Sequence, residues 1–163
     1  MNQTPPLPPG WDNWEQVMKM ALKQARLAEK KGEVPIGAIV LDPNGQILAR
    51  ACNAPISQND PAGHAEILAL RKAARKIKNY RLTGCVLAVT LEPCLMCLGA
   101  LVHARVGGLV FGARDPKAGA VVSRMQGTQL EFLNHGFPVL EGVLADECGD
   151  LLSRFFQARR KDK

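Results

Sequence analysis

The spacing of apolar residues predicts alternating helices and strands along most of the chain. From Asp12 to Gly32, apolar side chains recur with the period of an amphipathic helix, and Asp12 with Glu15 forms a predicted capping pair at its start. The same period returns at residues 64–78, 94–105 and 146–160. We therefore expect a helix in each of these segments.

Short apolar runs between the helices predict strands. Residues 34–41 and 46–52 flank the sequence Asp42-Pro43-Asn44-Gly45, which is typical of the turn in a β-hairpin. Further strands are predicted at 85–91, 109–112 and 139–144. Because a strand, a helix and another strand follow one another through Cys94, at least one pair of strands should be parallel, as in a layered α/β fold.

The pattern indicates one domain after a short leader. Residues 1–10 include Pro5, Pro6, Pro8 and Pro9, which have no backbone N–H to donate, so we expect a flexible proline-rich leader. Residues 11–163 contain no repeat and no linker, and this length suits a single hydrophobic core. No stretch reaches the ~18 consecutive apolar residues of a membrane span, so no membrane association is expected.

Charge and cysteine content narrow the function classes only slightly. The chain has 21 lysine and arginine residues against 15 acidic ones, a net charge of +6. Such a balance favours a polyanionic partner, but it is equally common in a domain that its charge keeps soluble. The number of cysteines is odd, and a disulfide framework is not expected, which fits a reducing cytoplasm.

Two short motifs carry the candidate chemistry. His64-Ala65-Glu66 and Pro93-Cys94-Leu95-Met96-Cys97 together offer one imidazole, two thiols and one carboxylate. Zinc binds imidazole and thiolate, and with three protein ligands it keeps a fourth position for water. We therefore predict His64, Cys94 and Cys97 as the ligands of one catalytic zinc ion. Glu66 is the predicted proton carrier of a hydrolytic deamination, with a nucleobase as the expected target.

Helix geometry supports this ligand set and raises one difficulty. Cys94 and Cys97 lie three residues apart at a predicted helix start, where both face one side and the helix dipole favours thiolate. Glu66 follows His64 by two residues, and on a regular helix the two side chains diverge by about 200°. Both would have to reach the site from the opening turn.

A structural zinc site is the alternative to a catalytic one. It needs a fourth protein ligand, for which the chain offers His103, His135 and Cys148. His103 lies on the predicted helix of Cys97 and points about 240° away from it. His135 and Cys148 stay open as fourth ligands, although a structural site has no use for Glu66.

The charge of the ligands suggests why a base is needed. Two thiolates cancel the formal charge of zinc, so this site acidifies water less than a site of three histidines does. In this hypothesis Glu66 takes the proton from water, donates it to a ring nitrogen and later protonates the departing ammonia.

Segments within and beyond these motifs resemble the bacterial tRNA-specific adenosine deaminases, the TadA family of the cytidine-deaminase-like superfamily. The resemblance covers about residues 14–160 and rests on Asn53, Pro55-Ile56, His64-Ala65-Glu66, Asn79-Tyr80-Arg81-Leu82, Leu91-Glu92-Pro93-Cys94 with Cys97, Phe111-Gly112-Ala113-Arg114-Asp115 with Lys117, and Ala145-Asp146-Glu147-Cys148. Two departures are the start of the chain, which has no counterpart, and Cys52, where many relatives have an aromatic residue.

The resemblance implies a fold, a reaction and site residues. The fold would be a three-layer α/β/α sandwich with a central mixed five-stranded sheet, and the protein a homodimer. The reaction would convert adenosine to inosine at the wobble position of an arginine tRNA with an ACG anticodon, with one zinc ion per subunit bound by His64, Cys94 and Cys97. Glu66 would carry protons and Asn53 would hold the flipped nucleotide. Asp115 and Lys117 would lie near the anticodon stem-loop.

The end of the chain offers further candidate RNA contacts. Two phenylalanines at 155–156 precede a basic stretch, and single-strand readers pair aromatic faces with cations in this way. Read alone, the segment is as well explained by two core phenylalanines and a solvated charged end. With the resemblance, Phe156, Arg159 and Arg160 are expected to contact RNA.

Two rival functions share part of this pattern. A deaminase of a free base or nucleoside, such as guanine or cytosine, would use the same zinc motif, but the basic chain end has no evident use with a small neutral substrate. A non-catalytic, zinc-stabilised RNA-binding module would instead require four protein ligands on the metal.

Overall fold

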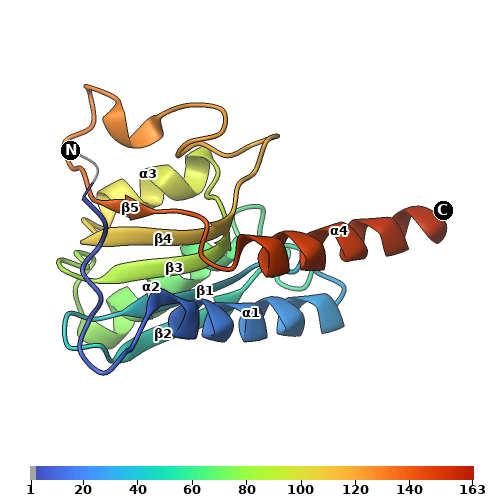
Figure 1. The fold of residues 1–163 in the computed structure, drawn as a ribbon, viewed down its shortest axis with the longest axis horizontal. Coiled ribbons are helices and arrows are strands. Elements are labelled where there is room, and N and C mark those ends of the chain that lie inside the picture. Colours follow the sequence, from blue (N-terminus) through green and yellow to red (C-terminus); the bar gives the residue numbers. More distant parts are fainter. Residues whose placement is uncertain (1–2) are drawn as a thin grey trace.

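Helices cover both faces of one sheet in the computed structural model, which describes residues 3–163 (Figure 1). In chain order the elements are α1 (Trp14–Lys30), β1 (Gly37–Leu41), β2 (Ile47–Cys52), α2 (Ala65–Ile77), β3 (Val86–Leu91), α3 (Leu95–His103), β4 (Gly108–Ala113), the short 3-10 helix η1 (Gly127–Gln129), β5 (Val139–Leu140) and α4 (Ala145–Lys161). Within residues 3–163, none of the helices combines the length and the apolar character that a bilayer crossing requires.

The sheet is mixed, as expected, with the strand order β2-β1-β3-β4-β5. β1 pairs antiparallel with both β2 and β3, whereas β3–β4 and β4–β5 are parallel pairs. The parallel pair across Cys94 confirms the prediction from the strand, helix and strand order. It follows from the pairing that β2 also runs in the direction of β3.

Each face of the sheet has its own apolar core. In Figure 1, α1 and α4 lie in front of the sheet and α2 and α3 behind it. Along β3 the side chains alternate between the two cores: Leu87 and Val89 belong to the core under α2 and α3, and Val86 and Ala88 to the core under α1 and α4. A strand that is buried on both faces reads as a continuous apolar run, which is why the sequence predicts it well.

Two element boundaries differ from the sequence prediction. The cap of α1 is Asn13, whose Oδ1 accepts the backbone N–H of Gln16 at 2.9 Å, so the predicted Asp12 cap is wrong by one residue. The last strand covers two residues instead of 139–144. Gly142 and Leu144 have φ values of +82° and +51°, which turn the chain out of the sheet and into α4.

The proline-rich segment docks on the domain. Residues 3–10 form no helix or strand, but Pro5 and Pro8 are buried. A Cβ atom added to Gly108 would lie 2.7 Å from Cβ of Pro5, which shows how closely the segment approaches β4. The Trp11 indole then donates a hydrogen bond of 2.9 Å to the backbone oxygen of Gly45. Buried prolines at these contacts describe a docked segment rather than a free leader.

Three strands end at the same edge of the sheet. Because β2, β3 and β4 run in one direction, the residues that follow them leave the sheet on the same side. These residues are Asn53 after β2, Pro93-Cys94 after β3 and Arg114-Asp115 after β4. The topology therefore gathers the chemistry-bearing segments at one edge, as is usual for ligand sites of α/β sheets.

The contact of Trp11 with the hairpin leads to a stability prediction. Trp11→Ala removes a partly buried ring packed on the α1 and α4 core, together with its hydrogen bond, and should lower the free energy of unfolding by about 2 kcal/mol in urea denaturation. Trp11→Phe keeps the ring and should lose about half of that. Equal stability of Trp11→Ala and wild type would show that the segment adds nothing to the fold.

Candidate active site

His64 reaches the site from just outside a helix. It is the N-cap of α2, with an extended backbone at φ −73° and ψ 150°, and helical geometry begins only at Ala65. The divergence expected between His64 and Glu66 on a regular helix therefore does not apply. The His64 side chain extends from the residue before the helix, whereas Glu66 lies in the first turn of α2.

The two cysteines sit at the start of α3 in a similar way. Cys94 is the N-cap, with φ −75° and ψ 175°, and Cys97 lies one turn into the helix and is fully buried. The first backbone N–H groups of a helix have no partner inside it and carry the positive end of the helix dipole. Both α2 and α3 thus begin at the metal-binding cluster formed by His64, Cys94 and Cys97.

The distances within this cluster fit a tetrahedral zinc ion. Nδ1 of His64 lies 3.6 Å from Sγ of Cys94 and 3.5 Å from Sγ of Cys97, and all three ligand atoms lie within 4.8 Å of one another. Zinc bonds of about 2.0 Å to nitrogen and 2.3 Å to sulfur, at a tetrahedral angle, separate the two atoms by about 3.5 Å. The three predicted ligands are brought together and fit zinc.

The candidate fourth ligands lie elsewhere. Within residues 3–163 the cluster comprises only His64, Cys94 and Cys97. His135 is bonded to the backbone oxygen of Val106 at 2.8 Å, and Cys148 is buried in the core on the opposite face of the sheet. His103 lines a groove between α2 and α3. A site with four protein ligands is therefore not assembled in the described part of the chain.

Glu66 is buried next to this cluster. Only 4% of its surface is exposed. Burial raises the pKa of Glu66 to about 7, against the lowering effects of a backbone hydrogen bond and of His64. A carboxyl group with a pKa near neutrality can both accept and donate a proton, as general acid–base chemistry requires.

One cysteine of the pair is already a thiolate. The hydrogen bond from Cys97 lowers the pKa of Cys94 to about 4 against the raising effect of burial, and His64 lowers it further. The same hydrogen bond raises the pKa of Cys97. The Cys94 sulfur therefore carries a negative charge at neutral pH, the form in which cysteine binds metal.

Asn53 is tied to the helix that follows it. Its side chain is 4% exposed, and Oδ1 accepts the backbone N–H of Ala65 at 2.8 Å. The loop between them is anchored by the buried Glu33, whose Oε1 accepts the backbone N–H of Ser57 at 2.7 Å. The amide group of Asn53, the residue directly after the end of β2, is thus held against the start of α2.

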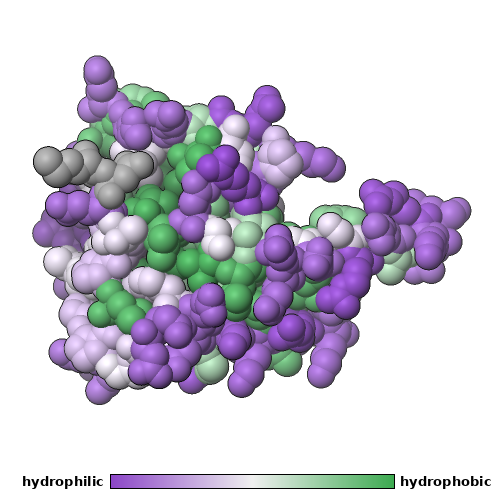
Figure 2. Space-filling model, viewed as in Figure 1, coloured by the Kyte–Doolittle hydropathy of each residue, from purple (hydrophilic) through white to green (hydrophobic). Residues whose placement is uncertain are grey.

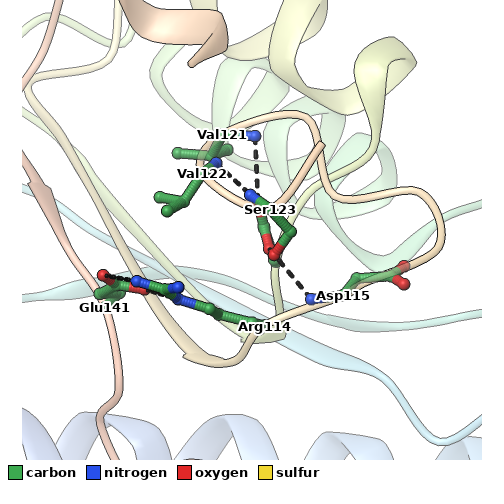
Figure 3. Close-up of polar contacts among 7 residues, drawn as sticks. Arg114, Asp115, Val121, Val122, Ser123 and Glu141 are labelled. Carbon is green, nitrogen blue, oxygen red and sulfur yellow. Dashed lines mark hydrogen bonds and ion pairs between the residues drawn. The ribbon is translucent and has the colours of Figure 1, made fainter. Parts of the chain in front are cut away.

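Asp115 and Lys117 lie in the loop after β4, at the same sheet edge. Lys117 is exposed and Asp115 is half-buried, and Oδ1 of Asp115 accepts the backbone N–H groups of Lys117 and Ala118 at 3.0 Å and 3.2 Å. The Asp115 carboxylate therefore shapes its own loop. Next to it, Arg114 forms a two-pronged ion pair with Glu141, at 2.6 Å and 2.7 Å (Figure 3).

Sequence reasoning missed Glu92, the residue before Pro93. Figure 3 shows the backbone nitrogen atoms of Asp115, Val121 and Val122 turned towards one another, and all three donate to the Glu92 carboxylate. Burial raises the pKa of Glu92, but hydrogen bonds from Ser123 and from these backbone groups outweigh it and hold the pKa below its ordinary value. A glutamate at the end of a buried apolar strand was the signal in the sequence, since a charge there needs partners.

The end of α4 presents some, but not all, of its predicted RNA-contacting residues. Phe155 is buried and Phe156 is 44% exposed. The guanidinium of Arg159 lies 4.8 Å from the Phe155 ring centre and donates to the backbone oxygen of Gly32, so it fastens α4 to the end of α1. Arg160 is exposed, and the far end of α4 projects from the body with hydrophilic side chains (Figure 2).

Comparison with known proteins agrees with this site. The model of the MafB19-like deaminase family matches residues 12–160. A tRNA-specific adenosine deaminase of Haemophilus influenzae is 49% identical over 149 residues, which cover 91% of this chain and 86% of that protein. One of Bacillus subtilis is 48% identical over 149 residues, covering 91% and 92%.

Solved structures show the same fold. A structure from studies of A-to-I editing by tRNA:A34 deaminases at the wobble position of transfer RNA has a TM-score of 0.82 and 39% identity, and it covers 84% of this chain and 99% of that one. A guanine deaminase from Nitrosomonas europaea has a TM-score of 0.74 and 28% identity, covering 94% and 88%. With this similarity along nearly its whole length, the chain belongs to the tRNA-specific adenosine deaminase family.

Proposed function

We propose that this protein hydrolyses adenosine to inosine at the wobble position of an arginine tRNA with an ACG anticodon. The observation that carries the proposal is the buried carboxyl group of Glu66, with its pKa near neutrality, beside a cluster of three metal ligands. The family of the chain supports tRNA as the substrate.

His64, Cys94 and Cys97 would hold one zinc ion, which supplies a Lewis acid that activates water. Glu66 accepts the proton that water loses and donates it to the adjacent ring nitrogen of adenine as the carbon–oxygen bond forms. It then moves a proton to the amino group, which leaves as ammonia when the carbon–nitrogen bond breaks. Adenosine and water thus give inosine and ammonia, and Glu66 ends in its starting state.

The substrate base must leave its stack to reach a buried carboxyl group. Oδ1 of Asn53 is already bonded to Ala65, which leaves the side-chain NH₂ group as the donor for the flipped nucleotide. Asp115 and Lys117 follow at the same sheet edge. Phe156 and Arg160 at the end of α4 would stack on a base and contact phosphate further along the stem-loop.

A guanine deaminase is the second candidate, because a solved guanine deaminase shares the fold at 28% identity. The higher identity of the tRNA-specific relatives and the basic end of α4 favour RNA. A free base would leave Arg160 and Lys161 without a role in binding.

The homodimer and the cytoplasmic location are also proposals. Tyr80, which lines the apolar groove between α2 and α3, is 66% exposed, and Leu95 and Met96 at the start of α3 are 61% and 39% exposed. Exposed apolar side chains of this kind are suited to contact with a second copy of the chain. The five cysteines are unpaired, which suits the reducing cytoplasm where tRNA is processed.

Removing the proton carrier should separate catalysis from metal binding. Glu66→Ala should keep about one zinc ion per chain, measured by metal analysis, and reduce kcat about 10³-fold or more. Glu15→Ala, which removes an exposed carboxylate on α1, is the control and should leave kcat unchanged. Turnover by Glu66→Ala at a rate near wild type would refute the role of Glu66.

The substrate is identified by offering RNA and free bases side by side. We expect inosine in the anticodon stem-loop of the arginine tRNA and no turnover of guanine, cytosine or free adenosine at the same enzyme concentration. Product analysis by mass spectrometry measures both. Conversion of guanine alone would replace the tRNA proposal with the second candidate.

The role of α4 can be tested through binding. Phe156→Ala should weaken stem-loop binding about tenfold through lost stacking, and Arg160→Ala should reduce the slope of log Kd against log salt by about 1. Lys19→Ala, an equally exposed cation on α1, should leave the slope unchanged. An unchanged Kd and slope for both α4 variants would remove this helix from the RNA interface.

A further inference from the structure

We propose that Glu92 is a positioning residue of the reaction, which fixes the loop of residues 114–123 to the metal-ligand turn so that the loop contacts the RNA at a set distance from the metal. The proposal rests on the proposed function. It assigns to Glu92 a role that neither metal binding nor proton transfer accounts for.

The Glu92 carboxylate accepts hydrogen bonds from both ends of this loop. Oε1 accepts the backbone N–H groups of Val121, Val122 and Ser123 at 3.2, 2.7 and 2.8 Å. Oε2 accepts the backbone N–H of Asp115 at 3.0 Å and the hydroxyl of Ser123. One side chain thus holds both ends of the loop.

These five donors use the full hydrogen-bonding capacity of the carboxylate. A carboxylate has about four lone-pair positions, and Glu92 is 2% exposed, so its oxygen atoms face the loop donors instead of solvent. The carboxylate of Glu92 is therefore committed to the loop.

Backbone contacts tie the same two segments together. The backbone N–H of Ala120 donates to the oxygen of Pro93 at 2.9 Å, and that of Glu92 donates to the oxygen of Ala113 at 2.9 Å. Pro93 directly precedes the metal ligand Cys94. The loop and the ligand turn are therefore joined by both side chain and backbone.

Close approach at Gly119 shows how tightly the loop fits. A Cβ atom added there would collide with the Glu92 carboxylate and would lie 2.6 Å from the backbone oxygen of Asp115. On the other side, Val121 and Val122 line a pocket of about 670 Å³, and Ala120 and Val121 pack into the core under α2 and α3. The loop is therefore held by apolar packing on one side and by its hydrogen bonds to Glu92 on the other.

The consequence concerns Asp115 and Lys117, which belong to this loop. Their distance from the metal is set by the link between Glu92 and the backbone of residues 115 and 121–123. Loss of the link should weaken RNA binding without loss of the metal. Substituting a residue that only stabilises the fold would change neither the RNA affinity nor the hydrogen exchange of this one loop at temperatures well below unfolding.

Glu92→Gln is the direct test, because an amide of the same shape places NH₂ where a backbone N–H or the Ser123 hydroxyl now donates. Gly119→Ala disturbs the same contact from the loop side and serves if Glu92→Gln does not fold. Glu141→Gln is the matched control, since it removes an exposed carboxylate that pairs with Arg114 in the same region, whereas the donors to the Glu92 carboxylate come from Asp115 and residues 121–123.

Each variant is made in the Glu66→Ala background, and its Kd for the anticodon stem-loop, its zinc content and the hydrogen exchange of residues 113–127 are measured. For Glu92→Gln and Gly119→Ala we expect Kd to rise about tenfold, exchange of this loop to accelerate, and zinc to stay at one ion per chain. The control should match its parent in all three.

Faster loop exchange with an unchanged Kd would overturn the proposal, and so would unchanged exchange or loss of zinc. Failure of the proposed function gives a different result, because the parent protein would then not bind the stem-loop at all. In that case the same substitutions, made in the protein with Glu66 intact, are compared on the base that wild type deaminates. An unchanged KM for that base overturns the proposal, and a raised KM supports it.

Discussion

The meeting of two helix N-termini is the constraint on which the rest of the site depends. His64 and Cys94 are both N-caps, but neither side chain bonds to the backbone of its helix. The imidazole and the sulfur therefore lie at the positive ends of two helix dipoles and are available to a metal. This placement favours the charged form of Cys94, and Cys97 completes the set one turn later. Asn53 supplies the cap that His64 leaves open, and that is why it lies in the site.

Two buried glutamates show how the surroundings of a carboxyl group set its pKa. Glu66 has few partners, and its burial brings its pKa to about 7, whereas Glu92 is surrounded by donors that outweigh its burial and hold its pKa low. Glu66 lies in the first turn of α2 and Glu92 directly follows β3. Burial dominates at Glu66 and the surrounding donors dominate at Glu92, so the pKa of the same side chain is shifted in opposite directions.

The sequence could predict what local chemistry and periodicity determine. The strands buried on both faces and the amphipathic helices follow from apolar spacing, and the three ligands follow from their residue types. The early end of β5 could not be predicted, because Val143 and Leu144 are apolar but pack against the α1 and α4 core instead of extending the sheet. Docking of Pro5 and the contacts of Glu92 depend on partners more than fifteen residues away, which no local pattern contains.

Helix α4 is packed on the sheet at its start and projects from the body at its end (Figure 1). Its base is set so close to the sheet that a side chain on Gly112 would lie 2.5 Å from Sγ of Cys148, while its 17 residues span about 25 Å towards solvent. A rotation of about 5° at the base would move the free end by about 2 Å. The hydrogen bond from Arg159 to the backbone oxygen of Gly32, just after α1, limits this displacement. A displacement of the α4 tip therefore need not move His64, Cys94 and Cys97, which lie on other elements.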